Sequence, residues 1–413
     1  MDRLTQAAFD ALDRADPLAG FRAEFQLSED TIYLNGNSLG PLPKAAAQAV
    51  RKAAEEEWGA GLVTSWNRAG WFDLPYRLGA CLAPLIGAAP DEVVLTDAAG
   101  LNLFKAAALA LALNPTRKSV VMEGSNFPTN NYMVQGLISF LAQGHRIRFV
   151  EKEDILDAID ADTAATILTH VHYRTAHILD MRIITQRAKA VGALTVWDLC
   201  HSAGVLDVDL NAAGADLAVG CTYKYLNGGP GSPAFIFMAR RHHGKAVQPL
   251  TGWWGHRAPF SFDRDYQPRN GVGQLLTGTQ PILSLRAAEA GIDLACRADP
   301  KAVRHKAMQL GDLFIRLVEE RCGDRGFALE SPRLGIERGG HVAFTHPQGY
   351  PIMRALIARG VIGDFRAPTT LRFGFSPLFL RYRDVWRAVE TLADIMEREL
   401  WTDPAYQAAE AVT

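Results

Sequence analysis

The sequence predicts an α/β fold in which a mostly parallel sheet is sandwiched by helices, with a smaller α+β domain beside it. From about residue 75 to residue 240, seven short runs rich in β-branched residues alternate with helical patterns. Alternation of this kind is typical of a parallel sheet whose strands are connected through helices. Beyond about residue 285, longer helical patterns surround a few strand-like runs, among them HVAFTHP and LRFGFSP. This change of pattern indicates the second, smaller domain.

The expected elements can be placed along the chain in order. A helix around residues 3–14 precedes YLNGNSLGPLP, whose glycines, asparagines and prolines favour a loop. A long alanine-rich helix is expected from about 43 to 58, because Val50, Ala54 and Trp58 share one face at helical spacing. The expected strands are 92–97, 119–124, 146–151, 165–171, 194–199, 217–222 and 234–239, and further helices are expected at about 100–113, from 129, and at 182–191.

The domain organisation follows from the same reading. Residues 61–285 are expected to form the large domain, which holds the sheet, and residues 286–413 the small domain. Residues 1–60 are expected to join the small domain as an N-terminal segment. In parallel sheets, ligands bind at the carboxyl ends of the strands. The large domain is therefore where a ligand site is expected.

Composition and charge exclude several classes of function. The net charge of −2 leaves no basic excess for a nucleic-acid backbone. The longest apolar runs are far shorter than a membrane span, and the acidic N-terminus does not resemble a signal peptide. The five cysteines lack CxxC pairs and zinc-ligand spacing. We expect free thiols in a reducing cytoplasm, with no metal, membrane or nucleic-acid partner.

One lysine stands in an unusual setting. In CTYKYLNGGPGSPAFIFM, residues 221–238, Lys224 lies between two tyrosines and precedes a glycine-rich run. Upstream, Asp198 ends the apolar run of VWDLCHSAG, and His201 follows one turn later. A desolvated lysine is nucleophilic and suited to a Schiff base, and pyridoxal phosphate also needs an acid at its pyridinium nitrogen and a cradle of backbone N–H groups. Alone, Lys224 would be read as a surface charge, Asp198 as a cap and His201 as a packed side chain; the three together favour the cofactor.

The whole chain resembles the kynureninase family, whose members are pyridoxal-phosphate enzymes of fold type I. The resemblance rests on nine separated blocks in order: YLNGNSLGPLP, SWNRAGWFDLP, NLFK, NFPTN, VWDLCHSAG, YKYLNGGPGSPAF, GWWGH, GTQPIL, and GDFRAP with LRFGFSPL. The family hydrolyses kynurenine at Cβ–Cγ and releases anthranilate and alanine. The resemblance therefore implies a pyridoxal 5′-phosphate-dependent hydrolase with a small amino-acid substrate.

The resemblance also implies residue roles. Lys224 would bond to the cofactor aldehyde and move protons at the substrate α-carbon, Asp198 would pair with the pyridinium nitrogen, and Tyr223 would reach the phosphate and donate a proton. The further cofactor contacts it implies are Ala99, Gly100, Phe127, Pro128, Thr129, Asn130, Thr169, His201, Trp253 and Thr279. The substrate contacts it implies are Ser38, Trp66, Thr279 and Arg372, with Arg372 clamping the α-carboxylate. Trp253 would come from the other subunit of a homodimer. The aromatic side chains could instead be ordinary core residues.

Other positions bear on substrate choice. Trp66 and Thr279 match the bacterial form of the family, where an apolar slot favours the unsubstituted ring over 3-hydroxykynurenine. Asn130 stands where the family has an acid, which removes a charge near the cofactor ring and adds a hydrogen-bond donor.

Three further departures occur near the expected site. Ala99 and Gly100 lack the hydroxyl group usual in the family's phosphate loop. His172 and Ala176 stand where the family favours Asn and Gly. These changes fit drift among relatives or a kynureninase-like enzyme with a different or modified substrate.

Two other functions remain open. Another reaction of the same cofactor, such as transamination or cysteine desulfurisation, would fit the fold, but desulfurisation needs a mobile catalytic cysteine and only Cys322 lies in a loop-like segment. A binding protein that kept the fold would be expected to lose Lys224 or Asp198, and both are present.

Overall fold

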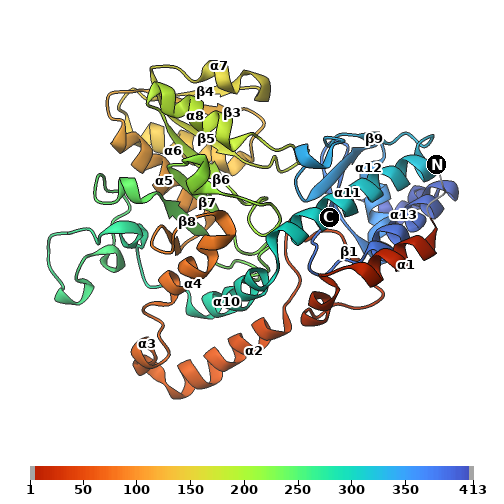
Figure 1. The fold of residues 1–413 in the computed structure, drawn as a ribbon, viewed down its shortest axis with the longest axis horizontal. Helices are drawn as coiled ribbons and strands as arrows, with labels where there is room; N and C mark the ends of the chain where they lie inside the picture. Colours follow the sequence, from red (N-terminus) through yellow and green to blue (C-terminus); the bar gives the residue numbers. More distant parts are fainter. Residues whose placement is uncertain (1–4, 409–413) are drawn as a thin grey trace.

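A seven-stranded sheet forms the centre of the larger of two lobes (Figure 1). The computed structural model describes residues 5–408. The strands are β2 (Val93–Leu95), β3 (Ser119–Glu123), β4 (Arg146–Val150), β5 (Thr163–Thr169), β6 (Leu194–Asp198), β7 (Leu217–Gly220) and β8 (Phe235–Met238). Their order across the sheet is β2-β8-β7-β6-β5-β3-β4, and β8 is antiparallel to both of its neighbours. The predicted α/β class with a mostly parallel seven-stranded sheet is therefore confirmed.

Side chains that alternate along each strand cover the two faces of this sheet. Trp197 and Phe235 point into one core, whereas Val196 and Ile236 point into the other. This period of two is what a strand buried on both faces requires. The helices over the Trp197 face are α4 (Leu74–Leu82), α8 (Met181–Val191) and α10 (Ile282–Arg297). Those over the Val196 face are α5 (Ala99–Leu113) and α6 (Pro128–Leu141).

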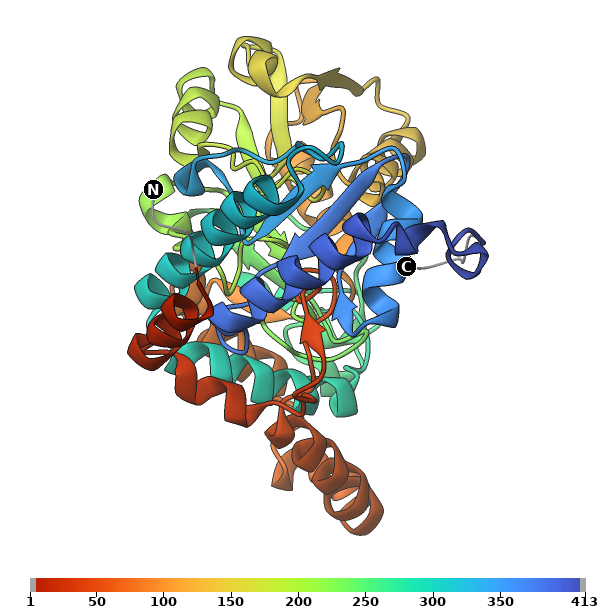
Figure 2. The ribbon, with the colours of Figure 1, turned by 90° about the vertical axis from the view of Figure 1, so that its right-hand side faces the viewer.

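The smaller lobe is built on an antiparallel sheet with its own core. Its strands, in the order β12-β13-β10-β9, are Asp364–Arg366, Thr370–Gly374, His341–Thr345 and Ala328–Leu329. Its helices are α11 (Pro300–Cys322), α12 (Gly349–Ala358) and α13 (Tyr382–Glu397). From the N-terminal segment, α1 (Gln6–Ala15) packs on α13 through the fully buried Phe9, and β1 (Ile32–Tyr33) pairs with β11 (Val361–Ile362). Figure 2 shows α1 and β1 lying across this lobe.

The helix predicted from about 43 to 58 differs from the observed one. Helix α2 spans Lys44–Lys52, and residues Ala53–Ala60 continue it in π-helical form. A π-helix closes i→i+5 hydrogen bonds, so its period differs from the 3.6 residues per turn on which the expected shared face rests. Trp58 is 60% exposed. The segment forms an arm that projects from the molecule (Figures 1 and 2).

Helix α10 connects the two lobes and contains residue 285, where we placed a domain boundary. Its residues contribute to the core of the large lobe, for example Leu285, and to that of the small lobe, for example Leu294. The division into three stretches stays a prediction. The remaining short helices are α3 (Ser65–Arg68), α7 (Ile155–Ala158) and α9 (Leu210–Ala213). Within residues 5–408, no helix combines the length and the apolar character needed to cross a membrane.

Candidate active site

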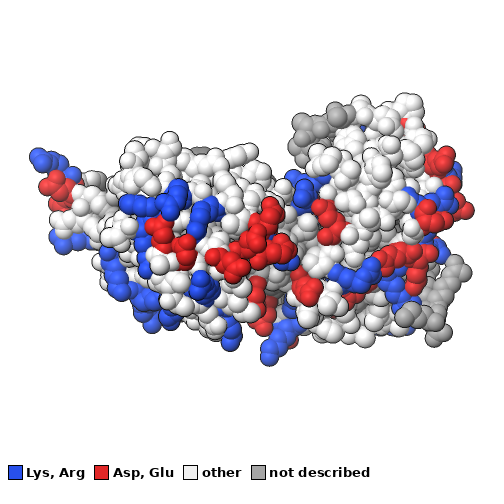
Figure 3. Space-filling view, turned by 90° about the horizontal axis from the view of Figure 1, so that it is seen from above, with Lys and Arg blue, Asp and Glu red and all other residues white. Residues whose placement is uncertain are grey.

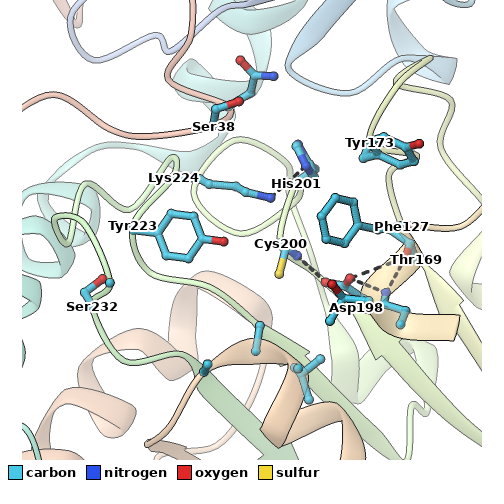
Figure 4. Close-up of a pocket in the computed structure, with 18 of the residues that line it drawn as sticks. Ser38, Phe127, Thr169, Tyr173, Asp198, Cys200, His201, Tyr223, Lys224 and Ser232 are labelled. Carbon is cyan, nitrogen blue, oxygen red and sulfur yellow. Dashed lines mark hydrogen bonds between the residues drawn. The ribbon is translucent and has the colours of Figure 1, made fainter. Parts of the chain in front are cut away.

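A cavity of about 450 Å³ opens at the carboxyl edge of the large sheet. Five strands end there, so the segments that follow β2, β3, β5, β6 and β7 all contribute to its wall. The small lobe adds Arg366 and Arg372, and the N-terminal segment adds Asn37 and Ser38. The site therefore lies where the strand ends of one lobe meet the sheet of the other (Figure 4).

Lys224 follows β7 and extends into this cavity. Its Nζ lies 2.9 Å from Nε2 of His201, which comes from the turn after β6. Burial, assisted by the charge of Lys224, lowers the pKa of His201 well below its usual value. A neutral imidazole is therefore the hydrogen-bond partner of the Lys224 side chain, which it orients in the cavity.

Asp198 is the last residue of β6 and is only 6% exposed. The backbone N–H of Cys200 donates to Oδ1 at 2.8 Å, and the side-chain amide of Asn130 donates to Oδ2 at 2.8 Å. Thr169, the residue paired with Asp198 on β5, lies beside the same oxygen. Both oxygens of Asp198 are thus held in place at the cavity wall, where the side chain could pair with a cationic ring nitrogen.

Asn126 organises this corner, and the sequence analysis did not select it. Its Oδ1 accepts from the N–H of Phe127 at 2.7 Å, from the hydroxyl of Thr169 at 2.5 Å and from the amide of Asn130 at 3.4 Å. Because Thr169 gives its proton to Asn126, the amide of Asn130 is the side-chain donor left for Asp198. The N-cap of α6 is Phe127, so Asn126 lies one position before the usual capping residue, and NFPTN carried no capping signal that would have identified it.

The N-terminus of α5 forms another part of the wall. Ala98 occupies the N-cap position, and its methyl side chain cannot accept the N–H groups of the first turn. Ala99 and Gly100 line the cavity, so those N–H groups are suited to an anion. A Cβ on Gly100 would come within 3.1 Å of the methyl group of Thr129, which leaves little room for a larger residue. These groups fit the phosphate of a pyridoxal cofactor, as Lys224 and Asp198 fit its aldehyde and its ring nitrogen.

A buried lysine fixes the turn before α5. Lys105, 1% exposed, donates from Nζ to Asp97 at 2.5 Å, to the carbonyl of Leu275 at 2.6 Å and to Thr277 at 2.8 Å. Burial lowers the pKa of Lys105, and the nearby charge of Asp97 raises it. The effect of burial is the larger, so the pKa of Lys105 lies below its ordinary value. The lysine thus ties the strand-end turn to the segment that leads to Thr279.

Arg372 is 2% exposed and reaches the cavity from β13. Its Nε donates to Oδ1 of Asp364 at 2.8 Å, and its Nη2 donates to Ser38 at 2.7 Å. Burial would raise the pKa of Asp364, but the charge and hydrogen bonds of Arg372 outweigh burial and lower it. Arg366 also donates to Asp364, at 2.8 Å. Asp364, which lies within GDFRAP and was not among the predicted site residues, holds the guanidinium in place.

Tyr223 and Phe127 face the same space. Burial raises the pKa of Tyr223 far above its ordinary value, so the phenol keeps its proton. Phe127 is 42% exposed and makes an edge contact with Tyr173, whose ring lies 5.3 Å away. Tyr173 is a further wall residue that the sequence analysis missed (Figure 4).

Four of the expected residues are not in this wall. Pro128 starts α6, a position that suits its fixed φ. Trp66 packs against Trp71 and Trp254, with ring centroids 5.4 and 5.2 Å away. Trp253 is 41% exposed, and Thr279 is also exposed. Their contacts with cofactor or substrate stay predictions, and that of Trp253 involves a second subunit.

The two other departures lie behind the Phe127 turn. His172 places Nε2 2.9 Å from the carbonyl of Ser125 and stacks on His177 at 4.8 Å. Burial lowers the pKa of His172 to about 4, so it is neutral. Ala176 has φ of +66°, a left-handed conformation that glycine adopts without strain and alanine does not. Both residues shape the support of the wall without lining the cavity.

Comparisons with known proteins agree on one family. Residues 303–392 match the kynureninase C-terminal domain, and residues 80–343 match aminotransferase class V. The chain is 52% identical over 408 residues to kynureninase of Burkholderia mallei (strain SAVP1), covering 98% of both chains. It is 48% identical, over the same shares, to kynureninase of Pseudomonas fluorescens.

Similar solved structures share the fold at low sequence identity. A cysteine desulfurase from Thermococcus onnurineus NA1 aligns with a TM-score of 0.77 at 18% identity, covering 92% of this chain and 98% of that one. The cystine C–S lyase C-DES aligns with a TM-score of 0.77 at 16% identity, covering 89% and 98%. At these identities the likeness concerns the fold alone.

Proposed function

Because this chain belongs to the kynureninase family, we propose that it hydrolyses the Cβ–Cγ bond of L-kynurenine to give anthranilate and L-alanine, with pyridoxal 5′-phosphate as cofactor. The observation that carries the proposal is 52% identity over 98% of the chain to a kynureninase, together with Lys224 and Asp198 in the wall of one cavity. A cofactor enzyme of another family would not share the full length at this level.

The cofactor supplies an electron sink for the substrate α-carbon when it is bound. Residues of the chain would hold the cofactor and transfer protons. Lys224 would hold the cofactor aldehyde and would move the proton at the substrate α-carbon. His201, neutral and with Nε2 2.9 Å from Nζ, would orient the Lys224 side chain through this hydrogen bond. Tyr223 keeps its phenolic proton, and we assign to it the role of proton donor.

The substrate carboxylate is assigned to Arg372. Asp364 holds its Nε edge, and the Nη2 bond to Ser38 is one that a carboxylate can replace or join. Because the guanidinium is oriented before substrate arrives, little side-chain entropy is lost on binding. This pre-orientation supports an α-amino acid as the substrate class.

We further propose that the enzyme is a cytoplasmic homodimer. Large apolar side chains are exposed on the α2 arm and on the loop after Trp253, including Val63 at 76%, Phe260 at 63% and Phe262 at 80%. A second copy would cover them and could bring Trp253 to the partner's phosphate site. In contrast, the face shown in Figure 3 mixes acidic and basic side chains, as a surface left in water would. Light scattering of the wild type and of a Phe260→Ser/Phe262→Ser variant tests the assembly; a wild-type monomer would contradict it.

Borohydride and anthranilate fluorescence test the reaction. The purified protein loaded with pyridoxal phosphate should release anthranilate from kynurenine, and borohydride should fix the cofactor on the peptide containing Lys224. Lys224→Ala should lose both signals. Release of another product from a different amino acid, with no anthranilate, would contradict the proposal and support the altered-substrate alternative. Comparing kynurenine with 3-hydroxykynurenine tests the expected preference for the unsubstituted ring.

A further inference from the structure

Two cysteines flank the reactive centre without a part in the proposed reaction. Cys200 lies two residues after Asp198, and Cys221 lies three residues before Lys224. Their strands are parallel neighbours, and Asp198 is paired with Val219. The ladder continues one step further, since the N–H of Leu199 donates to the carbonyl of Val219 at 2.7 Å. Extending the register by two residues sets Cys200 opposite Cys221, with both side chains on the same side of the ladder.

This placement suits a covalent bond. Neighbouring strands lie about 4.8 Å apart, and a disulfide needs a Cα separation of roughly 4.4–6.8 Å. The thiol of Cys221 already reaches the neighbouring strand, because its Sγ donates to the carbonyl oxygen of Cys200 at 3.7 Å. Closing a bond between the two thiols would need only a small movement of the strand ends.

The two thiols differ in charge and access. The hydrogen bond to Cys221, and then burial, raise the pKa of Cys200 well above the ordinary value. Burial would raise the pKa of Cys221, but the hydrogen bond from Cys200 and the charge of Lys224 outweigh it and lower the pKa. Cys200 is partly exposed and lines the cavity between Tyr223 and Asp198 (Figure 4), whereas Cys221 is buried beneath it. A small oxidant can therefore enter and meet one thiol with the second beside it.

We propose that Cys200 and Cys221 form an oxidisable dithiol, in which hydrogen peroxide or a similar small peroxide closes a disulfide across the active site. The first step breaks the O–O bond, turns one thiol into a sulfenic acid and releases one water. The second thiol then attacks that sulfur, the S–S bond forms, and a second water leaves. Both thiols are oxidised together by two electrons, and the peroxide is reduced.

The disulfide would disturb the groups on either side. The N–H of Cys200 donates to Asp198 at 2.8 Å, so pulling Cys200 toward the neighbouring strand strains that hydrogen bond. The same bond pulls on the turn that carries Lys224. Under the proposed function, on which this consequence rests, oxidation stops turnover and reduction restores it. The enzyme thereby gains a reversible response to peroxide.

A second pair of cysteines provides a control within the same chain. Cys81 on α4 and Cys296 on α10 are both exposed, and Sγ of Cys296 lies 3.1 Å from the carbonyl oxygen of Cys81. This pair is accessible to the same oxidant but is not in the wall of the cavity. A Cys81→Ser/Cys296→Ser variant separates general thiol oxidation from the proposed effect.

The test treats the loaded enzyme with hydrogen peroxide, blocks free thiols by alkylation, and maps peptides without reduction. We expect a cross-link between residues 200 and 221, with at least a tenfold loss of anthranilate formation that dithiothreitol reverses. Cys200→Ser and Cys221→Ser should each stay within twofold of their own untreated activity, whereas Cys81→Ser/Cys296→Ser should respond like the wild type.

Either of two results would overturn the dithiol: no cross-link between 200 and 221 while Cys81 and Cys296 are oxidised, or an equal reversible loss in both single Ser variants. The cross-link is read by mass and does not depend on activity. A cross-linked protein that never forms anthranilate would leave the dithiol standing and refute the proposed function instead.

Discussion

Replacing Asn130 with aspartate tests how the chain holds Asp198. The amide of Asn130 lies 2.8 Å from Oδ2 of Asp198, and each residue is 6% exposed. Asn130→Asp would place two carboxyl oxygens at that distance in the same buried corner. The resemblance to the family implied an acid at this position, so the substitution also measures what the chain gains from its neutral donor.

The strength of the repulsion between the two carboxylates follows from the distance between their oxygens. Two unit charges 2.8 Å apart at an effective dielectric constant of about 20 repel each other by about 6 kcal/mol. Holding one proton on a carboxyl group of pKa about 4 at pH 7 costs about 4 kcal/mol. Proton uptake is the cheaper solution, so without cofactor the pair should share one proton at neutral pH, with an apparent pKa near 8 that belongs to the pair.

The raised apparent pKa of the carboxyl pair fixes how the free energy of unfolding of the Asn130→Asp variant changes with pH. The folded variant binds one proton more than the unfolded chain between about pH 4 and pH 8, so its free energy of unfolding falls as pH rises through that window. Between pH 5 and pH 7 the variant should lose about 3 kcal/mol relative to the wild type. Urea denaturation of the two cofactor-free proteins at both pH values measures this difference.

Asn131→Asp is the matched control. It adds the same charge in the same first turn of α6, but Asn131 donates to the carbonyl of Gly124 and not to Asp198. Its pH dependence should follow the wild type within about 0.5 kcal/mol. If Asn130→Asp and Asn131→Asp showed the same pH dependence, the contact between Asn130 and Asp198 would not control the charge of this corner.

Two further predictions concern the opposite wall and the buried histidines. Asp364→Asn should raise KM for kynurenine about 10- to 100-fold, because a charged hydrogen bond worth roughly 1.5–3 kcal/mol no longer orients Arg372. The Kd of the cofactor should stay within about twofold of the wild-type value. An unchanged KM would contradict the assignment of the substrate carboxylate to Arg372. Burial lowers the pKa of His201 and His341 well below the ordinary value. The unfolded chain therefore binds more protons below about pH 6.5, and stability should fall by up to about 2 kcal/mol per histidine at pH 5. Urea midpoints at pH 7 and 5 should show a smaller fall for His341→Phe than for the wild type, and an equal fall would refute the argument.

The parts of the fold that follow from local pattern could be predicted. Six of the seven strands are buried on both faces, and such strands need continuous β-branched and aromatic runs, which were visible in the sequence. The edge strand β4, whose residues are exposed or half-buried, was visible as RIRFV. Helices α5, α6 and α8 begin or end within about one residue of their expected positions because strand-end turns delimit them. The helix around Trp58 could not be placed in the same way, because a π-helical turn changes the period without a distinct composition.

The residues of the site also differ in whether local sequence pattern predicts them. Lys224 and Asp198 could be brought together from sequence because the carboxyl ends of parallel strands meet at one edge. Asn126 could not, since its role depends on the hydroxyl of Thr169, 43 positions away. The dithiol depends on the register between β6 and β7, which two separate runs of apolar residues do not specify. The sequence thus predicts the strands, but it does not specify which residues of neighbouring strands lie opposite each other.

The groups proposed for the cofactor and the arginine proposed for the substrate come from different lobes. The groups suited to the cofactor, Asp198 and Lys224 among them, all come from strand ends of the large lobe, whereas Arg372 comes from the sheet of the small lobe. Arg372 also donates from Nη1 to the carbonyl of Tyr173 at 2.5 Å, a bond that crosses between the lobes. A shift of one lobe against the other would therefore misalign the carboxylate clamp and leave the cofactor contacts intact. Changes at the lobe boundary should act on substrate binding first, and changes at the strand ends on cofactor binding first.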